Sequence, residues 1–323
     1  MNKSGVTLGI DIGGTNTSMA IVDKDGNIIA KDSIATLAMD PAADLFKRLF
    51  NKFTEIYSPL REKFELIGVG IGAPNANYYN GTVENPPNLN WGVVDIVALV
   101  KEYYDLPVAV TNDANAAALG EMKFGVAKGM KNFIQITLGT GLGSGIVVNG
   151  EMLYGADGFA GEMGHTIVVK DGRKCGCGRR GCLETYASAS GIKRTAFELL
   201  ADSTEKSTLR GISFNDLTSK NIYDAAMAGD KVAQSAFKNT GKILGQAMAD
   251  AVAYLSPEAF VLFGGLANSG ELIIEPTRKY LENNLLSNYR GKIKILQSGL
   301  PEGDAAVLGA AALIWHELSI IPQ

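Results

Sequence analysis

Two stretches decide the fold of this chain: Ile10-Asp11-Ile12-Gly13-Gly14-Thr15 and Leu138-Gly139-Thr140-Gly141-Leu142-Gly143-Ser144-Gly145. In each, an apolar segment runs into a glycine turn, and a second apolar segment follows, at residues 19–22 and 146–148. Asp25-Gly26 and Asn149-Gly150 close the two copies, and such pairs favour two-residue hairpin turns. The two glycine turns, which start at Gly13 and Gly139, are 126 residues apart, and the closing pairs, which start at Asp25 and Asn149, are 124 residues apart. This nearly constant offset indicates an internal duplication.

The glycine turns are suited to binding phosphate. Glycine can take positive φ, and its backbone N–H groups can approach an anion closely. The hydroxyls of Thr15 and Thr140 add further donors, so two copies facing each other would leave a phosphate between them. Because each turn joins antiparallel strands, the dinucleotide fingerprint and the Walker loop, which both lead into a helix, are excluded. The open alternative is a pair of ordinary tight hairpins.

Composition and charge limit the function classes. The 323 residues are enough for two domains, and 46% hydrophobic content is ordinary for a globular enzyme. A net charge of −4 and a pI of about 5.4 argue against a nucleic-acid-binding surface. The basic cluster Arg173, Lys174, Arg179 and Arg180 is interpreted as a solvated loop.

Neither the most apolar stretch of the chain nor its N-terminus predicts a membrane or secreted protein. The most apolar stretch, residues 247–267, is interrupted by Asp250, Ser256, Pro257 and Glu258. The first residues lead directly into a strand and show no secretory pattern. A cytoplasmic protein is therefore expected.

Strands and helices alternate along the chain, which indicates an α/β architecture in each half. Helices are expected at about 41–57, 93–103, from 113, within 188–255 and from 304, and residues 72–91 are expected to be irregular. Strands are expected at 6–12, 18–22, 27–31, 66–71 and 107–111, with a last strand at 259–263 ending at Gly264-Gly265. The expected domains are residues 1–118 plus 304–323, and residues 119–303.

All three cysteines, Cys175, Cys177 and Cys182, fall within eight residues, and His165 lies ten residues upstream. Three thiolates and one imidazole form a closed tetrahedral set, which is typical of a structural Zn²⁺ site. A disulfide is disfavoured because three cysteines leave one unpaired and nothing indicates an oxidising compartment. We therefore predict a structural zinc site in this loop.

Two carboxylates accompany the predicted zinc ligands. Glu162 precedes His165 by three residues, and Glu184 follows Cys182 by two. Carboxylates accept hydrogen bonds from pairs of hydroxyl groups, which suggests a sugar or polyol ligand at this locus. The alternative is that both are surface groups or support the metal ligands.

Asn112-Asp113 follows an apolar strand directly and precedes an Ala-rich helix. Because ligands gather at the carboxyl ends of strands in α/β sheets, Asp113 is a candidate catalytic residue, although Asn and Asp also cap helices well. At a helix N-terminus, Asp113 is expected to stay ionised and to be a weak base, which suffices for phosphoryl transfer. Asp11, before the first glycine turn, is placed to hold Mg²⁺ through water.

These motifs, with the run Gly161-Glu162-Met163-Gly164-His165 and the zinc loop, resemble the ROK family of sugar kinases and repressors over nearly the whole chain. The resemblance implies two ribonuclease H-like, actin-like ATPase domains with a cleft between them. It implies ATP contacts at Gly13, Gly14, Thr15, Thr140 and Gly141, with adenosine near Gly264 and Gly265.

The resemblance also implies residue roles in the sugar site. Asp113 matches the catalytic base, and the sugar-binding positions match Asn88, Asn112, Glu162, His165 and Glu184. The turn Gly72-Ala73-Pro74 is expected to close over the sugar ring, but residues 75–79, Asn-Ala-Asn-Tyr-Tyr, depart from the family's Gly-Pro-Val sequence there. A homodimer or homotetramer is implied as well.

The preferred function is an ATP- and Mg²⁺-dependent hexose kinase, with glucokinase first. The alternatives are an N-acylhexosamine kinase, acting on N-acetylmannosamine or N-acetylglucosamine, and a fructokinase. A sugar-responsive repressor is disfavoured because only five residues precede Val6 and the chain is acidic. A catalytically silent sugar-binding protein is disfavoured because Asp11, Asp113 and both glycine turns are present.

Overall fold

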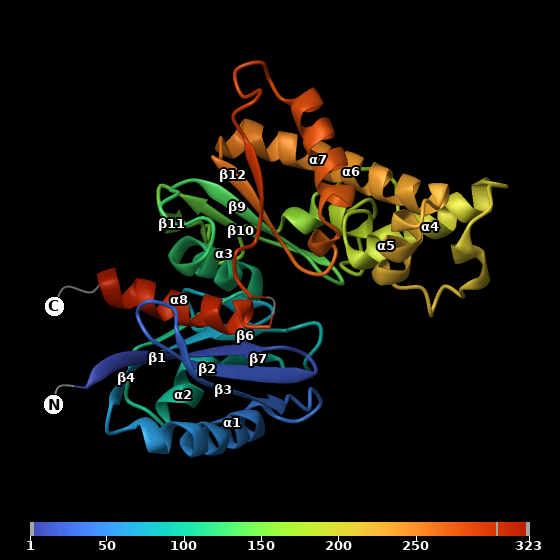
Figure 1. Cartoon of the computed structure of the whole chain (residues 1–323). Helices are drawn as coiled ribbons and strands as arrows, with labels where there is room; N and C mark the ends of the chain where they lie inside the picture. Colours follow the sequence, from blue (N-terminus) through green and yellow to red (C-terminus); the bar gives the residue numbers. More distant parts are fainter. Residues whose placement is uncertain (1–2, 302, 321–323) are drawn as a thin grey trace. The chain divides into compact units, whose positions relative to one another are not determined.

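The computed structural model describes residues 3–301 and 303–320, which divide into two compact units (Figure 1). Unit 1 holds the residues up to Met130, Met152–Ala160, and those from Gly299 onward. Unit 2 holds Lys131–Glu151 and Gly161–Ser298. The expected boundary after residue 118 falls inside one continuous helix, α3 (Asp113–Phe124). Residues 1–2 and 321–323 of the expected first domain lie outside the described residues.

The two units contain five-stranded sheets with the same strand order. The first runs β3-β2-β1-β4-β8, and the second runs β11-β10-β9-β12-β13. In each sheet, one strand pairs antiparallel with the next strand in the chain (β1 with β2, β9 with β10) and parallel with a later strand on its other side (β4 or β12). This shared arrangement supports the internal duplication inferred from the glycine turns. The strands are β1 (Ser4–Ile12), β2 (Asn16–Val22), β3 (Ile28–Ala35), β4 (Phe64–Gly72), β8 (Val108–Thr111), β9 (Phe133–Leu138), β10 (Leu142–Val148), β11 (Glu151–Met152), β12 (Ala259–Phe263) and β13 (Lys294–Gln297).

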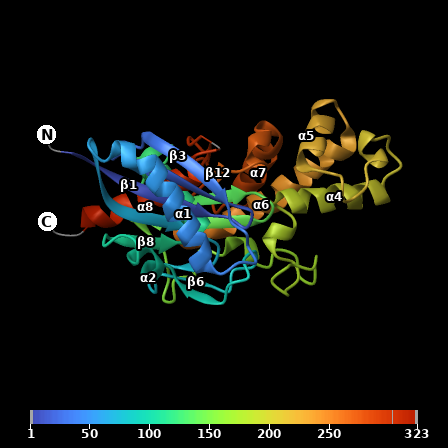
Figure 2. The same ribbon diagram turned by 90° about the horizontal axis from the view of Figure 1, so that it is seen from below.

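The first sheet is covered on both faces, as the alternation along β1 requires. Leu8 and Ile10 share a core with Phe46 of α1 (Ala42–Tyr57), which Figure 2 shows lying across the sheet. The opposite face carries Gly9, where a Cβ atom would lie 2.2 Å from the carbonyl oxygen of Val307. Glycine therefore lets α8 (Ala305–Ile320) pack closely on β1.

Unit 2 has a separate core around α6 (Lys231–Leu255), with α7 (Glu271–Asn284) packed against it at Gly245. Its remaining helices are α4 (Ala189–Asp202) and α5 (Ser219–Met227). Short 3₁₀ turns occur at Ser58–Leu60, Met163–His165, Leu183–Thr185, Thr208–Gly211 and Ala267–Ser269. Within the described ranges, none of the helices has the length and apolar character needed to cross a membrane.

Several expected elements differ from the structure. The stretch 72–91 contains two strands of a small sheet, β5 (Ala76–Asn77) and β6 (Thr82–Glu84), which continues with β7 (Val93–Asp95). The helix expected at 93–103 is shorter, α2 (Ile96–Lys101), because β7 takes its first residues. The strand at 259–263 is not the last: β13 follows α7, and its short, half-exposed sequence has no clear alternation.

The two closing turns also differ from each other. Asn149 and Gly150 have φ values of 56° and 85°, as the predicted two-residue hairpin requires. The first copy instead uses a five-residue connection, residues 23–27, in which only Gly26 has positive φ. The Asp23 carboxylate accepts the backbone N–H groups of Asp25 and Asn27, both at 2.9 Å, and so stabilises this longer turn.

Candidate active site

The parallel strands of the first sheet align two acidic residues around one glycine. Asp11 of β1 pairs with Gly72 of β4, and Gly72 pairs with Thr111 of β8. A Cβ atom at Gly72 would lie 3.9 Å from Asp11 Oδ1 and 3.8 Å from the Cα atom of Asp113. The row therefore places both acidic residues at the carboxyl ends of the strands, where Gly72 itself contributes no side chain and the Ala116 Cβ atom lies 3.3 Å from the position of a Cβ.

Burial changes the acidity of this pair. Loss of water raises the pKa of Asp11 to about 7, with a further contribution from the charge of Asp113. Dense packing around its carboxyl group also raises the pKa of Asp113, although the residue as a whole is exposed to solvent. Hydrogen bonding at the helix N-terminus lowers this pKa by less. Desolvation therefore acts on the pKa of Asp113 in the direction opposite to the expected effect of the helix N-terminus.

Helix capping at this position is performed by Asn112. Its side-chain oxygen accepts the backbone N–H of Ala114 at 2.8 Å, and Asn112 has the extended backbone of an N-cap residue. Asp113 is the first helical residue, and its Oδ1 accepts the same N–H group at 2.8 Å. Asn112-Asp113 could serve in helix capping or in catalysis, and the capping role therefore belongs mainly to Asn112.

The glycine turns join antiparallel strands as predicted, but the glycines serve a different purpose. Neither Gly14 nor Gly141 has positive φ. Both are needed for space: a Cβ atom at Gly14 would lie 3.0 Å from the Cβ of Asn88. One at Gly141 would lie 2.7 Å from Glu184 Oε2. Each turn therefore lies against a residue predicted to bind sugar.

The end of β12 lies beside the second glycine turn. Phe263 of β12 pairs with Thr137 of β9, just before Gly139. Gly264 has a φ of 99°, and a Cβ atom there would approach the Leu138 carbonyl oxygen to 2.8 Å. The structure thus brings the predicted adenosine and phosphate positions of unit 2 together.

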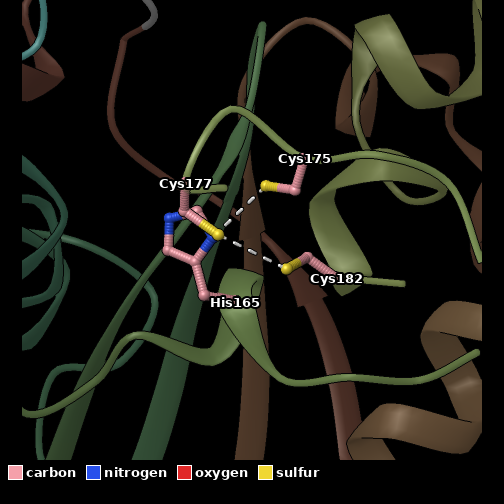
Figure 3. Close-up of side chains that lie close together, drawn as sticks. All are labelled: His165, Cys175, Cys177 and Cys182. Atoms are coloured by element: carbon pink, nitrogen blue, oxygen red, sulfur yellow. Dashed lines mark hydrogen bonds between the residues drawn. The ribbon is translucent and has the colours of Figure 1, made fainter. Parts of the chain in front are cut away.

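The cysteines and His165 form one cluster, shown in Figure 3. Their ligand atoms all lie within 4.8 Å of one another. Cys175 Sγ is 3.7 Å from His165 Nδ1, and Cys177 Sγ is 3.7 Å from Cys182 Sγ. A tetrahedral metal with bonds of about 2.3 Å to sulfur needs ligand atoms roughly 3.8 Å apart. The cluster therefore fits a structural metal.

The thiols of the cluster differ in acidity. Hydrogen bonds from Arg179 lower the pKa of Cys177 to about 6. Burial raises the pKa of Cys175 to about 12, helped by the Glu184 carboxylate, which lies 3.0 Å from its sulfur. Cys177 is thus ready to bind a cation as thiolate, whereas Cys175 must lose a proton to do so.

His165 connects this cluster to both neighbouring carboxylates. Its Nδ1 atom is 3.7 Å from Glu184 Oε1, and its Nε2 atom is 3.9 Å from Glu162 Oε2. Since Nδ1 faces the sulfur atoms, Nε2 is the nitrogen on the Glu162 side. Two carboxylates, an imidazole and the Gly141 turn therefore adjoin one another, an arrangement suited to a polyhydroxy ligand.

The predicted site residues are divided between the units. Unit 1 carries Asp11, Gly13, Gly14, Thr15, Asn88, Asn112 and Asp113. Unit 2 carries Thr140, Gly141, Glu162, His165, Cys175, Cys177, Cys182, Glu184, Gly264 and Gly265.

Arg173 is a supporting residue that sequence reasoning misread. Its side chain is only 8% exposed and forms an ion pair with Glu198 of α4. It also donates to the carbonyl oxygens of Thr185 and Gly191 and stacks on Tyr186. The solvated-loop interpretation is therefore wrong for Arg173, which anchors the zinc loop to α4. Its partners lie 12 to 25 residues away, so no local pattern indicated them.

Ser144 is a second residue that the sequence did not single out. Its buried hydroxyl donates to the Gly161 carbonyl oxygen and accepts the Met163 N–H at 3.2 Å. These bonds fix the backbone on both sides of Glu162. The only sequence signal was its place inside the second glycine-rich stretch.

Comparisons with known proteins agree with this geometry. The model of the ROK family matches residues 7–317. A glucokinase from Halalkalibacterium halodurans is 37% identical over 95% of this chain and 94% of its own length. The crystal structure of a ROK family glucokinase from Streptomyces griseus with glucose and AMPPNP superposes with a TM-score of 0.78, at 36% identity, covering 96% and 99% of the two chains. A xylose repressor from Bacillus spizizenii is 29% identical over 99% of this chain and 79% of the repressor.

Proposed function

The chain belongs to the ROK family and has its α/β fold, and on that basis we propose that it is an ATP-dependent glucokinase. The reaction transfers the γ-phosphoryl group of ATP to the 6-hydroxyl group of glucose, giving glucose 6-phosphate and ADP. The observation that carries the proposal is the full-length similarity to glucokinases, combined with the Asp11–Gly72–Asp113 arrangement. Phosphoryl transfer needs a base and a cation site. Two acidic residues at the carboxyl ends of parallel strands, where ligands bind in α/β folds, can supply both.

Asp113 is the proposed catalytic base. Its carboxylate takes the proton of the sugar hydroxyl as the oxygen attacks the γ-phosphorus and the bond to ADP breaks. The raised pKa makes Asp113 a stronger proton acceptor than an ordinary carboxylate. Positioning still contributes more than proton removal, because the transition state of phosphoryl transfer is loose.

The two glycine turns are proposed to bind the phosphates of ATP through backbone N–H groups. Gly264 and Gly265 are the proposed neighbours of the adenosine. Asp11 is the proposed residue for Mg²⁺, and its chemistry fits, since magnesium takes one or two carboxylates and keeps several waters. Bound Mg²⁺ would neutralise phosphate charge.

The sugar is proposed to bind Asn88, Asn112, Glu162, His165 and Glu184. Zinc is the proposed metal of the Cys₃His cluster, because three sulfurs and one nitrogen at near-tetrahedral spacing suit it. Its role would be to cross-link the loop that bears His165 and Glu184. A homodimer or homotetramer is proposed as well, to be measured by light scattering.

A coupled ADP-release assay tests the function. Glucose should give the highest kcat/KM among glucose, N-acetylmannosamine, N-acetylglucosamine and fructose. Asp113→Asn should lower kcat by about a thousandfold or more while the dissociation constant for glucose changes little, because the variant loses the base and keeps the contacts. Asp105→Asn, an exposed change on the same unit, serves as the control. Preference for another sugar would reassign the substrate, and an active Asp113→Asn enzyme would remove Asp113 as the base.

The similarity to a xylose repressor supports a second candidate, a sugar-responsive regulator. This candidate predicts sugar binding without sugar-dependent ADP release, together with a mobility shift on operator DNA. The same purified chain can be used for both assays, so the two functions are directly distinguishable.

A further inference from the structure

Three consecutive residues, Asn77, Tyr78 and Tyr79, hold one loop of unit 1, residues 154–160. Asn77 Nδ2 donates to the Asp157 carbonyl oxygen at 2.9 Å, and Tyr79 Oη donates to the Gly155 carbonyl oxygen at 2.8 Å. The Tyr78 ring stacks on that of Tyr154, with centroids 3.8 Å apart and planes 4° apart. We call these contacts the clasp. They lie where the sequence departs from the family's Gly-Pro-Val pattern.

The held loop is closed and closely fitted. The Ala160 N–H donates to the Tyr154 carbonyl oxygen at 3.0 Å, which closes the loop. Gly158 has a φ of 87°, and a Cβ atom there would lie 2.6 Å from Asn77 Oδ1. Asn77 is itself 3% exposed. The backbone of the loop is therefore determined by the clasp.

This loop leads directly into the proposed sugar site. The loop is part of the unit 1 segment Met152–Ala160, and the residues that flank this segment, Glu151 and Gly161, both belong to unit 2. Glu162 follows Ala160 by two residues. Ser144 holds the backbone at Gly161 and at Met163, on both sides of Glu162, and the clasp holds the chain that leads into this segment.

The clasp also contacts the strand that carries the proposed base. The Tyr154 hydroxyl lies near the side chain of Thr111, the last residue of β8. Thr111 is fully buried and precedes Asn112-Asp113 directly. Tyr154 therefore lies beside the residue that precedes Asn112 and Asp113. It is also the first residue of the loop that precedes Glu162.

We propose that Tyr78, Tyr79 and Tyr154 are positioning residues of the reaction, with separable effects. The Tyr78 stack and the Tyr79 hydrogen bond set the affinity for the sugar through Glu162. The Tyr154 hydroxyl sets turnover through Thr111 and Asp113. This inference rests on the proposed glucokinase function.

The test compares single substitutions in the clasp. The Tyr78 hydroxyl also donates to Glu317 Oε1 at 2.8 Å, so both Tyr78 variants lose that hydrogen bond and only Tyr78→Leu loses the stack as well. Tyr78→Leu, which loses the stack, should raise the KM for glucose about fivefold to tenfold without changing the KM for ATP. Tyr78→Phe keeps the ring and should restore the KM to within about twofold of wild type. Tyr79→Phe should raise the glucose KM about threefold, since one exposed hydrogen bond is lost. Tyr154→Phe should lower kcat about threefold to tenfold at nearly unchanged KM.

Tyr103→Phe is the matched control, because Tyr103 stacks on Phe50 in the same unit and has no part in the clasp. Thermal unfolding of every variant separates positioning from lost stability: a purely structural role lowers the melting temperature and moves all kinetic constants together or none. If the wild-type chain phosphorylates glucose, but Tyr78→Leu and Tyr79→Phe leave the KM for glucose unchanged, the inference is overturned and the proposed function is not. A wild-type chain that phosphorylates no sugar overturns the proposed function, and the inference with it.

Discussion

Gly72 shows how one residue can determine the chemistry of two others. It lies between Asp11 and Thr111 in the sheet register, and because it has no side chain, the Asp11 carboxylate and the backbone of Asp113 both approach it closely. Desolvation raises the pKa of each carboxyl group, and the charge of Asp113 raises that of Asp11 further. An acidic pair of this kind destabilises the fold unless a cation or a proton is bound.

Asp11→Asn should therefore stabilise the protein at high pH while reducing activity. The pKa of Asp11 rises on folding from 3.8 to about 7, so its favourable contribution is complete below pH 3.8 and is lost as the pH rises towards 7. At pH 8, in the absence of Mg²⁺, the variant should gain roughly 2 kcal/mol in the free energy of unfolding, a value reduced from the full shift because Asp11 is partly exposed.

Urea unfolding at pH 4 and pH 8 measures this difference. Asp105→Asn, at an exposed position, should behave alike at both pH values. An Asp11→Asn variant with equal stability changes at both pH values would rule out desolvation of Asp11 as the cause.

At the scale of elements, the zinc loop acts as a scaffold for carboxylates. Arg173 anchors it to α4, and Glu184 contacts both the Cys175 sulfur and the Gly141 turn. The same loop thus connects the metal cluster to the second glycine turn. Removing the metal should disturb sugar binding before it disturbs the sheet, whose core includes none of the four metal ligands.

Cys177→Ser should release the metal and raise the KM for glucose about tenfold or more, because Glu184 and His165 lose their fixed positions. Metal content by atomic emission and KM by the coupled assay are measured on the same preparation. Arg180→Ser, an exposed change in the same loop, should retain both metal and KM. A metal-free Cys177→Ser protein with wild-type KM would separate the cluster from sugar binding.

At the scale of the whole molecule, one strand order is used twice, and each copy presents a glycine turn between its first two strands. The two cores are built from different residues, so each sheet supports its own turn. A nucleotide that binds these turns is bound by the folded chain only. Its affinity therefore appears directly as added stability.

AMPPNP with Mg²⁺, at a hundred times its dissociation constant, should raise the free energy of unfolding by about 2.7 kcal/mol. The measurement is urea unfolding with and without the nucleotide, with the dissociation constant taken from calorimetry. Gly14→Val should lose most of this stabilisation, because its side chain would meet Asn88 beside the turn. Unchanged unfolding at saturating AMPPNP would argue against a nucleotide site.

Much of the fold was predictable because its signals are local. The glycine turns, the hairpin order and the spacing of Cys175, Cys177 and Cys182 are all read along the chain. The small sheet at residues 76–95 and β13 were not predicted, because strands of two to four residues carry no measurable alternation. The clasp was missed for another reason: Tyr78 and Tyr154 are 76 residues apart, and only packing brings their rings together.

The amino-acid sequence by itself determined the family, the repeated hairpins and the composition of the metal cluster, since these depend on residue types at fixed short spacings. Only the tertiary structure decided the acidity of Asp11 and Asp113, the burial of Arg173 and the contact of Glu184 with the Gly141 turn. The physical reason is that desolvation and steric contact depend on which distant segments exclude water from a group, and this is set by packing rather than by neighbours in the chain.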